Sequence, residues 1–247
     1  MKKKIILLGS GITGKYVTAK LEQSGYDVYP TSRRSEKFHN NQVLFDLENS
    51  ETWKNLPLNA EIIWIFSPTP ISSVSRFLEF LPKEISVRMV LGTTSVYVQR
   101  DGTVTEQSEI DEANERLQSE KILLDFGAVI LRCSGLYSQE RHPYQWLKND
   151  RILNGNKSVN LIHQMDLAKI ISRLLDTDIK SETFNISDGR NYLWKDIVQT
   201  GKEKKIIPED FVLPESEIEN RVISNEKILN ILNHDFQFHD EGWKPNR

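Results

Sequence analysis

Short apolar runs alternate along this chain with longer segments in which apolar and charged residues recur at helical spacing. Parallel strands need a crossover connection, usually a helix, so this alternation is typical of an α/β protein. We therefore expect a doubly wound parallel sheet with helices between its strands. The expected strands are 4–9, 27–31, 42–46, 61–67, 88–94, 128–133 and 183–186.

The first apolar run ends in a glycine-rich turn. Gly9, Gly11 and Gly14 have the spacing Gly-x-Gly-x-x-Gly, and a helix-like segment follows directly. Gly9 suits a tight turn, Gly11 lets the backbone approach a pyrophosphate, and Gly14 lets the helix pack closely on the strand. The first N–H groups of that helix would point at the anion. We expect a dinucleotide site here, and the alternative is a turn shaped by glycine alone. The expected contacts are Gly9, Ser10, Gly11, Ile12, Thr13 and Gly14.

The end of the second expected strand bears on which dinucleotide binds. An acidic residue at this place accepts the ribose hydroxyls of NAD, whereas arginine pairs with the extra phosphate of NADP. Here the chain has Ser32, Arg33 and Arg34 and no acid. Two guanidiniums and a hydroxyl suit a phosphate, so we expect NADP rather than NAD, with a solvated basic loop as the alternative. Asp46 either binds the adenine amino group or caps a turn, and Ser67 completes the expected cofactor contacts.

Composition limits the classes of function. Lys and Arg total 32 against 35 Asp and Glu, which argues against a general nucleic-acid binder. No apolar stretch approaches the roughly 18 residues of a membrane span. Cys133 is the only cysteine, so an internal disulfide and a cysteine-rich metal site are excluded. A single cysteine also suits a reducing cytosol, and we expect a cytoplasmic protein without metal, nucleic-acid or membrane partners.

Five short motifs occur in one order along nearly the whole chain. They are the glycine turn and the segments 91–97, 131–137, 162–168 and 184–188, and the segment 221–229 ahead of Glu241-Gly242-Trp243 adds to them. In this order they resemble extended short-chain dehydrogenases/reductases of the NAD-dependent epimerase/dehydratase type. The resemblance implies a dinucleotide-binding Rossmann core over 1–134, completed by a strand near 183–187. From residue 135 onward the alternation weakens, and we expect a mainly substrate-binding region over 135–247 that is not an independent domain. We also expect a small-molecule substrate and a homodimer as the assembly.

The resemblance breaks at the catalytic step. Family members carry a Ser or Thr after the fifth strand, matched here by Thr93. They also carry a helix with Tyr-x-x-x-Lys, in which the tyrosine is the acid/base and the lysine lowers its pKa. On the helix expected over 111–124, Glu112 stands for the tyrosine and Arg116 for the lysine if Glu120 is the glutamate that follows the pair. A glutamate titrates near pH 4.3, so tyrosine-type proton transfer does not fit this helix.

Other candidates lie away from that helix. Tyr97 is either a core residue or a proton donor, and Tyr144, four residues before Lys148, is either catalytic or part of a packed lid. His163 and Asp166 have the spacing of a metal or acid/base pair, but by the resemblance they form a junction at which Asp166 caps a helix. Arg132 is a candidate for holding an anionic group of the substrate.

Two functions follow from these observations. The first is an NADP-dependent oxidoreductase or epimerase/dehydratase-like enzyme that acts on a small carbonyl or alcohol. Its candidate catalytic residues are Thr93, Tyr97, Arg116 and Tyr144. The second is a catalytically silent NADP-binding sensor or regulatory protein, which the missing Tyr-x-x-x-Lys pair favours.

Overall fold

The computed structural model describes residues 2–36, 39–147, 152 and 154–232. Its centre is a seven-stranded parallel sheet with the order β11-β7-β5-β4-β1-β2-β3. The strands are β1 (Lys4–Leu8), β2 (Asp27–Ser32), β3 (Val43–Leu44), β4 (Ala60–Trp64), β5 (Ile85–Thr93), β7 (Val129–Cys133) and β11 (Thr183–Ile186). β2 and β4 pair with β1 from opposite sides, so the strand order reverses at β1. In such sheets ligands bind beyond the carboxyl ends of the strands where the order reverses.

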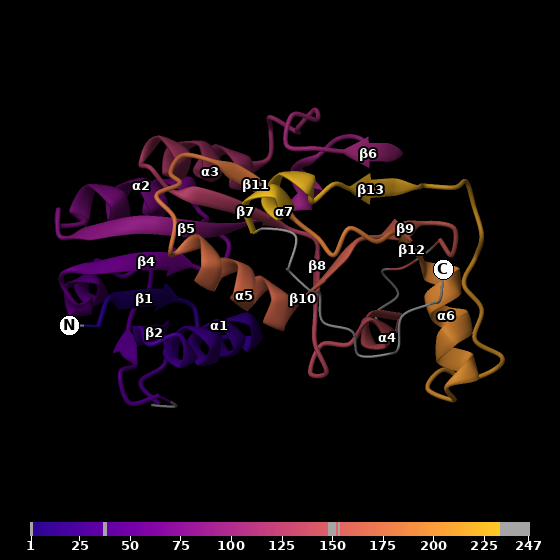
Figure 1. Cartoon of the computed structure of the whole chain (residues 1–247), viewed down its shortest axis with the longest axis horizontal. Coiled ribbons are helices and arrows are strands. Elements are labelled where there is room, and N and C mark those ends of the chain that lie inside the picture. Colours follow the sequence, from indigo (N-terminus) through magenta and orange to yellow (C-terminus); the bar gives the residue numbers. More distant parts are fainter. Residues whose placement is uncertain (1, 37–38, 148–151, 153, 233–247) are drawn as a thin grey trace. The chain divides into compact units, whose positions relative to one another are not determined.

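Helices cover both faces of the sheet, as Figure 1 shows. On one face are α2 (Ile71–Phe80) and α3 (Glu115–Asp125), and on the other are α1 (Ile12–Gln23) and α5 (Gln164–Leu174). Two short 3-10 helices, η1 (Ser50–Asn55) and η2 (Thr94–Val96), follow β3 and β5. The expected doubly wound α/β fold is therefore confirmed.

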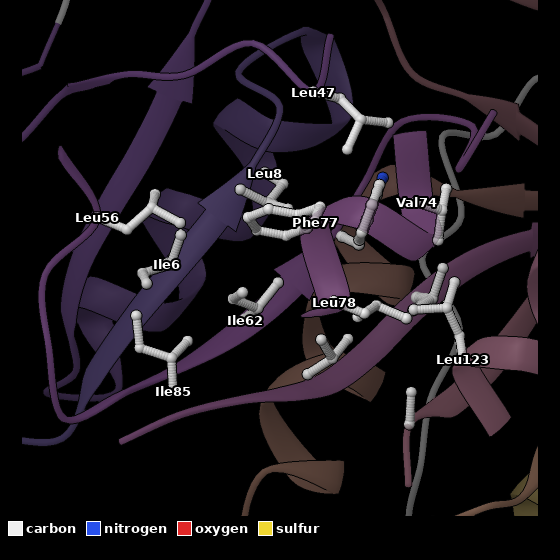
Figure 2. Packing of buried hydrophobic residues seen from close by; sticks show 14 of the residues in the cluster. Ile6, Leu8, Leu47, Leu56, Ile62, Val74, Phe77, Leu78, Ile85 and Leu123 are labelled. Atoms are coloured by element: carbon white, nitrogen blue, oxygen red, sulfur yellow. The ribbon is translucent and has the colours of Figure 1, made fainter. Parts of the chain in front are cut away.

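The core beneath α2 explains why that segment is helical. Val74, Phe77 and Leu78 recur at helical spacing and are all buried. Figure 2 shows Phe77 among Ile6, Ile62 and other side chains of the strands. The Phe77 ring also meets the rings of three other aromatic residues edge-on at 5.2–5.7 Å, which adds to the area burial of this helix.

The expected strand ends need correction. The third strand is only Val43–Leu44 instead of 42–46, and the fourth ends at Trp64 instead of residue 67. The fifth begins three residues early, at Ile85. The run after Trp64 leaves the sheet because two prolines follow at 68 and 70, and proline cannot donate to a strand ladder.

The chain forms two compact units. Unit 1 comprises Met1–Val96, Asp111–Arg132 and Leu167–Phe184, and it contains nearly all of the large sheet. Unit 2 comprises Tyr97–Ile110, Cys133–Asp166 and Asn185–Arg247. Each unit draws on segments that are far apart in sequence, so neither is a continuous stretch of chain.

The described residues of unit 2 form pairs of short strands and three helices. The strand pairs are β6 (Gly102–Val104) with β13 (Arg221–Ile223), β8 (Gly135–Tyr137) with β10 (Leu161–His163), and β9 (Ser158–Val159) with β12 (Tyr192–Leu193). The helices are α4 (Pro143–Trp146), α6 (Trp194–Glu203) and α7 (Glu226–Leu232). Its own hydrophobic core includes Tyr137, Tyr144 and Trp194. Among the described helices, none is long and apolar enough to cross a membrane.

Candidate functional site

The glycine turn joins β1 to α1, and each glycine meets a different constraint. Gly9 has a φ of +110°, a backbone conformation that side chains with a Cβ rarely adopt. A Cβ on Gly14 would overlap the carbonyl oxygen of Gly9, so only glycine allows this approach of helix to turn. A Cβ on Gly11 would meet nothing within 4 Å. The space beside Gly11 is therefore open to a ligand.

The N-terminus of α1 faces this open space without a side-chain cap. Gly11 is the N-cap residue and makes no side-chain hydrogen bond, and the first turn of α1 contains no acidic residue. The first backbone N–H groups of a helix and its dipole attract an anion. On the other side of the turn, Gly9 N donates to Thr31 Oγ1 at 3.1 Å, which holds β2 against the turn.

A cleft of about 1110 Å³ lies in unit 1 beyond the carboxyl ends of β1, β2 and β4. Eight of the expected cofactor residues line it: Gly9, Ser10, Gly11, Ser32, Arg33, Arg34, Asp46 and Ser67. The other three, Ile12, Thr13 and Gly14, are in the first turns of α1, where Thr13 and Gly14 are buried. The structure thus brings the residues of four separate segments to one place.

Seven lining residues were not expected from the sequence: Thr31, Glu36, Phe45, Leu47, Glu48, Phe66 and Thr69. Each of them lies within two residues of an expected one, so the signal that could have found them was their place at or just after the ends of strands. Phe45, Leu47 and Phe66 give the cleft an apolar side. Glu36 and Glu48 bring negative charge into a cleft that also contains two arginines.

The loop after β2 presents its arginines to solvent. Arg33 and Arg34 are both exposed and both line the cleft. Ser32 Oγ accepts a hydrogen bond from Arg34 N at 3.0 Å, which fixes a tight turn at the strand end. Asp46 also organises a turn, because its Oδ1 accepts from Glu48 N at 3.1 Å.

Thr93 ends β5, at the carboxyl edge of the sheet. Its Oγ1 accepts from Ser95 N at 3.2 Å and lies 3.0 Å from Ser95 Oγ, to which it donates. The side chain of Thr93 is held by the first turn of η2, and Ser95 is exposed. The Thr93 hydroxyl can polarise an oxygen of a bound molecule if it rotates its single proton away from Ser95 Oγ.

The helix expected over 111–124 begins later than expected, at Glu115. Asn114 is its N-cap, and its Oδ1 accepts from Arg116 N at 3.0 Å. Glu112 therefore lies before the helix, where its carboxylate forms an ion pair with Lys121. Glu112 and Arg116 do not form a helical i, i+4 pair. Arg116 is in the first turn of α3 and is exposed.

Glu120 and Arg132 form a buried ion pair in unit 1. Arg132 Nε donates to Glu120 Oε2 at 3.0 Å, and both side chains are almost completely buried. Burial raises the pKa of the Glu120 carboxyl, and the neighbouring guanidinium opposes the rise. Gly92 leaves room for this carboxylate, because a Cβ there would overlap Glu120 Oε1. Arg132, expected to hold an anionic group of the substrate, has a protein carboxylate as its partner instead.

The two candidate tyrosines are buried in unit 2. Tyr97 OH donates to Asn185 Oδ1 at 2.6 Å. Tyr144 is on α4 and packs in the core of unit 2, and burial followed by the charge of Glu203 raises its pKa. Lys148, the possible partner of Tyr144, lies outside the described residues. Thr93 and Arg116 belong to unit 1.

The junction at His163 differs from the expectation in one respect. α5 begins at Gln164, and His163 Nδ1 accepts from Met165 N at 3.2 Å. His163 therefore caps the helix, and Asp166 lies in its first turn instead of at the cap. Within the described residues, no group of three His, Cys, Asp or Glu side chains is placed to hold a metal ion.

Comparisons with known proteins identify the fold. No family model and no curated protein matches the sequence. Among solved structures, MoeE5 in complex with UDP-glucose and NAD matches with a TM-score of 0.77 and 16% identity over 97% of this chain and 95% of that one. dTDP-glucose 4,6-dehydratase of Bacillus anthracis in complex with NAD matches with a TM-score of 0.75 and 16% identity over 98% and 94%.

A short-chain dehydrogenase/reductase superfamily protein from Agrobacterium tumefaciens with bound NAD gives a TM-score of 0.73 and 17% identity over 99% and 93%. The resemblance drawn from the five motifs is thus confirmed at the level of the fold. The fold of this chain is the one that NAD-dependent epimerase/dehydratase and short-chain dehydrogenase/reductase proteins share.

Proposed function

We propose that this chain is a member of the extended short-chain dehydrogenase/reductase superfamily that binds NADP(H) in the cleft of unit 1. We propose further that it catalyses hydride transfer, alone or linked to an epimerisation or dehydration, on a small carbonyl or alcohol. The observation that carries this proposal is the cleft itself, in which the glycine turn and the two arginines lie together. The region over residues 135–247 is proposed as the part of the chain that mainly binds the substrate.

The residues of the cleft fit a dinucleotide phosphate by three separate features. The space beside Gly11 is free of protein atoms within 4 Å of a Cβ position. The N-terminus of α1 has no side-chain cap. Arg33 and Arg34 are exposed at the end of β2, where they can pair with a phosphate on the adenosine ribose.

The chemistry divides between cofactor and protein. A nicotinamide cofactor supplies or accepts the hydride when bound. The chain binds and orients it through the glycine turn, and the hydroxyl of Thr93 polarises the oxygen of the substrate. Such a hydrogen bond stabilises the charge that develops on the oxygen in the transition state.

Cofactor preference is tested by calorimetry with NADPH and NADH. In Arg33→Ala, the loss of a charge-assisted phosphate contact should cost roughly 1.5–3 kcal/mol for NADPH and little for NADH. Arg76→Ala is the matched control, because Arg76 is an exposed arginine that does not line the cleft. Equal affinity of the parent protein for both cofactors would refute the preference for NADP.

A second function is favoured by the helix that lacks the family pair. Glu112 lies before α3 and is paired with Lys121, so neither a tyrosine nor its lysine partner is present there. This arrangement favours a protein that binds NADP(H) without turnover and acts as a sensor or regulator.

The two functions are separated by the role of Thr93. A panel of small aldehydes, ketones and hydroxy acids is screened for NADPH oxidation or NADP reduction, with Thr93→Val, Tyr97→Phe and Tyr144→Phe beside the parent. An enzyme loses much more turnover than NADPH affinity in Thr93→Val, because the contact is made in the transition state. Tight NADPH binding without turnover on any substrate would identify the sensor. If Thr93→Val keeps the activity of the parent, the assignment of Thr93 as a catalytic residue is wrong.

A further inference from the structure

A second pocket lies within unit 2, between α4 and the turn that follows α6. Its volume is about 440 Å³, which falls in the range of roughly 300–1,000 Å³ that small-molecule sites occupy. α4 and α6 pack against each other in the core of this unit, and Figure 1 shows them as neighbours. The pocket shares no residue with the cofactor cleft.

One wall of the pocket is apolar and held in place. Leu147 and the turn residues Ile206, Ile207, Pro208 and Phe211 form this wall. The turn is fixed to α6, since the N–H groups of Ile206 and Ile207 both donate to the carbonyl of Gly201. Lys202 Nζ also donates to the Glu209 carbonyl at 2.7 Å. A wall that is already ordered binds a ligand with a smaller loss of conformational entropy.

The remaining lining residues are polar, and none of the described lining residues is Asp, Glu, Lys or Arg. They are Gln139, His142, Tyr144 and Gln145. His142 Nδ1 accepts from Tyr144 N at 3.3 Å, which fixes the imidazole at the start of α4. The two amides offer both donors and acceptors of hydrogen bonds.

The exposure of Ile206 marks the rim of this pocket. Its side chain is 56% exposed, although the neighbouring Ile207 is only 8% exposed. A large apolar side chain at the rim of an apolar pocket loses its contact with water when a ligand binds, which favours binding.

We propose that this pocket binds a small neutral molecule that combines an apolar body with one hydrogen-bonding group, such as an aromatic or branched aliphatic alcohol or carbonyl compound. An ionic ligand would lose hydration without gaining an opposite charge from the described lining residues. The apolar wall receives the body of the ligand, and the amides of Gln139 and Gln145 receive its polar group. Tyr144, a candidate catalytic residue of the proposed function, also lines this pocket, but the binding proposed here does not depend on cofactor binding or turnover.

The test uses the full chain and 4-methoxybenzyl alcohol as the probe, with 4-methoxybenzoate as a charged molecule of the same body. Binding is measured by ligand-observed NMR and calorimetry. We expect the alcohol to bind at least tenfold more tightly than the carboxylate. Ile206→Asp should weaken binding of the alcohol at least fivefold, because it places a carboxylate at the apolar rim.

Val212→Asp is the matched control. Val212 is 77% exposed and does not line the pocket, so the same charge is added nearby without entering the site. We expect its affinity for the alcohol to stay within twofold of the parent. Equal weakening by both variants would show a nonspecific charge effect and overturn the proposal.

Three further results would also overturn it: no binding of the alcohol by the full chain, tighter binding of the carboxylate, or binding only after removal of residues 233–247. The last result would mean that the chain's own end is the occupant. NADPH affinity is measured on the same samples. If the parent does not bind NADPH, the proposal of a cofactor site is refuted, whereas the proposal of a ligand site in this pocket still stands on its own result.

Discussion

Three glycines of one turn differ in what a methyl group would meet. At Gly14 it would overlap the backbone of Gly9, whereas at Gly11 it would meet open space. The motif predicts a packing role for Gly14 and a ligand-facing role for Gly11. The structure agrees with the first, because a Cβ on Gly14 has no room, and it leaves open space beside Gly11.

We expect Gly14→Ala to lower the free energy of unfolding by about 1–3 kcal/mol or more, since overpacking against backbone forces the helix away from the turn. Gly11→Ala should change it by less than about 1 kcal/mol, because only a modest N-cap preference is lost. Urea denaturation measures both. Equal destabilisation by the two variants would contradict the assigned roles.

Tyr26 predicts a difference in alkaline stability. Burial, together with a 2.9 Å hydrogen bond to Asp176, raises the pKa of this phenol from 10.0 to about 12. A pKa that is higher in the folded state means that the contribution of Tyr26 is complete below pH 10 and is lost as the pH rises through 12. The free energy of unfolding of Tyr26→Phe should therefore fall less steeply between pH 10 and 12 than that of the parent.

The reference for this comparison is the slope of the parent protein over the same two pH units, measured by denaturant titration. Other tyrosines with raised pKa values contribute equally to the pH slope of both proteins, so their contributions cancel in the difference between the slopes. Identical slopes would mean that Tyr26 ionises alike in the folded and unfolded chain.

For single residues, the sequence predicted the site well where the residues of a motif are neighbours along the chain. The glycine turn and Ser32-Arg33-Arg34 are continuous motifs, and the structure places their residues in one cleft. Arg132 was different, because its partner Glu120 comes from α3 and their contact depends on how that helix packs on the sheet. A pairing across separate elements leaves no trace in spacing along the chain.

Arg88 joins two elements, β5 and the end of α5. Its guanidinium donates to the carbonyls of Leu174, Thr177 and Ile179, and the side chain is buried. The last carbonyls of a helix have no partners within the helix, and a cation there also interacts favourably with the helix dipole. Arg88 therefore acts as a cap for α5 that comes from the neighbouring strand.

Arg88→Leu should lower the free energy of unfolding by about 3 kcal/mol or more, because one buried and two half-buried acceptors lose a charged donor. Arg76→Leu, on the exposed side of α2, should change it by no more than about 0.5 kcal/mol. Calorimetry or denaturant unfolding compares them. A small effect of Arg88→Leu would show that water replaces the guanidinium at these carbonyls.

Elements with strong periodicity were the ones that the sequence predicted well. The core strands were placed within a few residues, since each is a continuous apolar run. The predicted start of α3 at residue 111 was wrong. Asn114, three residues later, is the N-cap, because its side chain accepts a hydrogen bond from Arg116 N. β9 and β12 have two residues each, too few to show any alternation.

For the whole molecule, cofactor binding should appear as thermal stabilisation. A ligand that binds only the folded state at 100 times its Kd adds about 2.7 kcal/mol. For a chain of this size such a gain raises Tm by several degrees. We expect NADPH to raise Tm more than NADH at equal concentration, as measured by calorimetry, and the difference should disappear in Arg33→Ala.

The place of the segment Tyr97–Ile110 in unit 2 was not visible in the sequence. The segment Tyr97–Ile110 belongs to unit 2 because β6 pairs with β13, more than a hundred residues further along. The sequence indicated a core over 1–134 with a strand near 183–187 and a second region over 135–247, and it did not single out residues 97–110. Long-range pairing of three-residue strands carries too little local preference to predict.

The late position of β11 has a consequence for the time course of synthesis. β7 is buried along all five residues, and in the large sheet it lies between β5 and β11, where Ile130 N donates to Glu182 O at 2.8 Å. A ribosome that adds about 5–20 residues per second takes roughly 2–10 s to make the stretch of about 50 residues between these strands. During that interval the nascent chain exposes an apolar strand edge that could pair with another chain. Growing chains of this protein should therefore need a chaperone most between the appearance of Cys133 and that of Ile186.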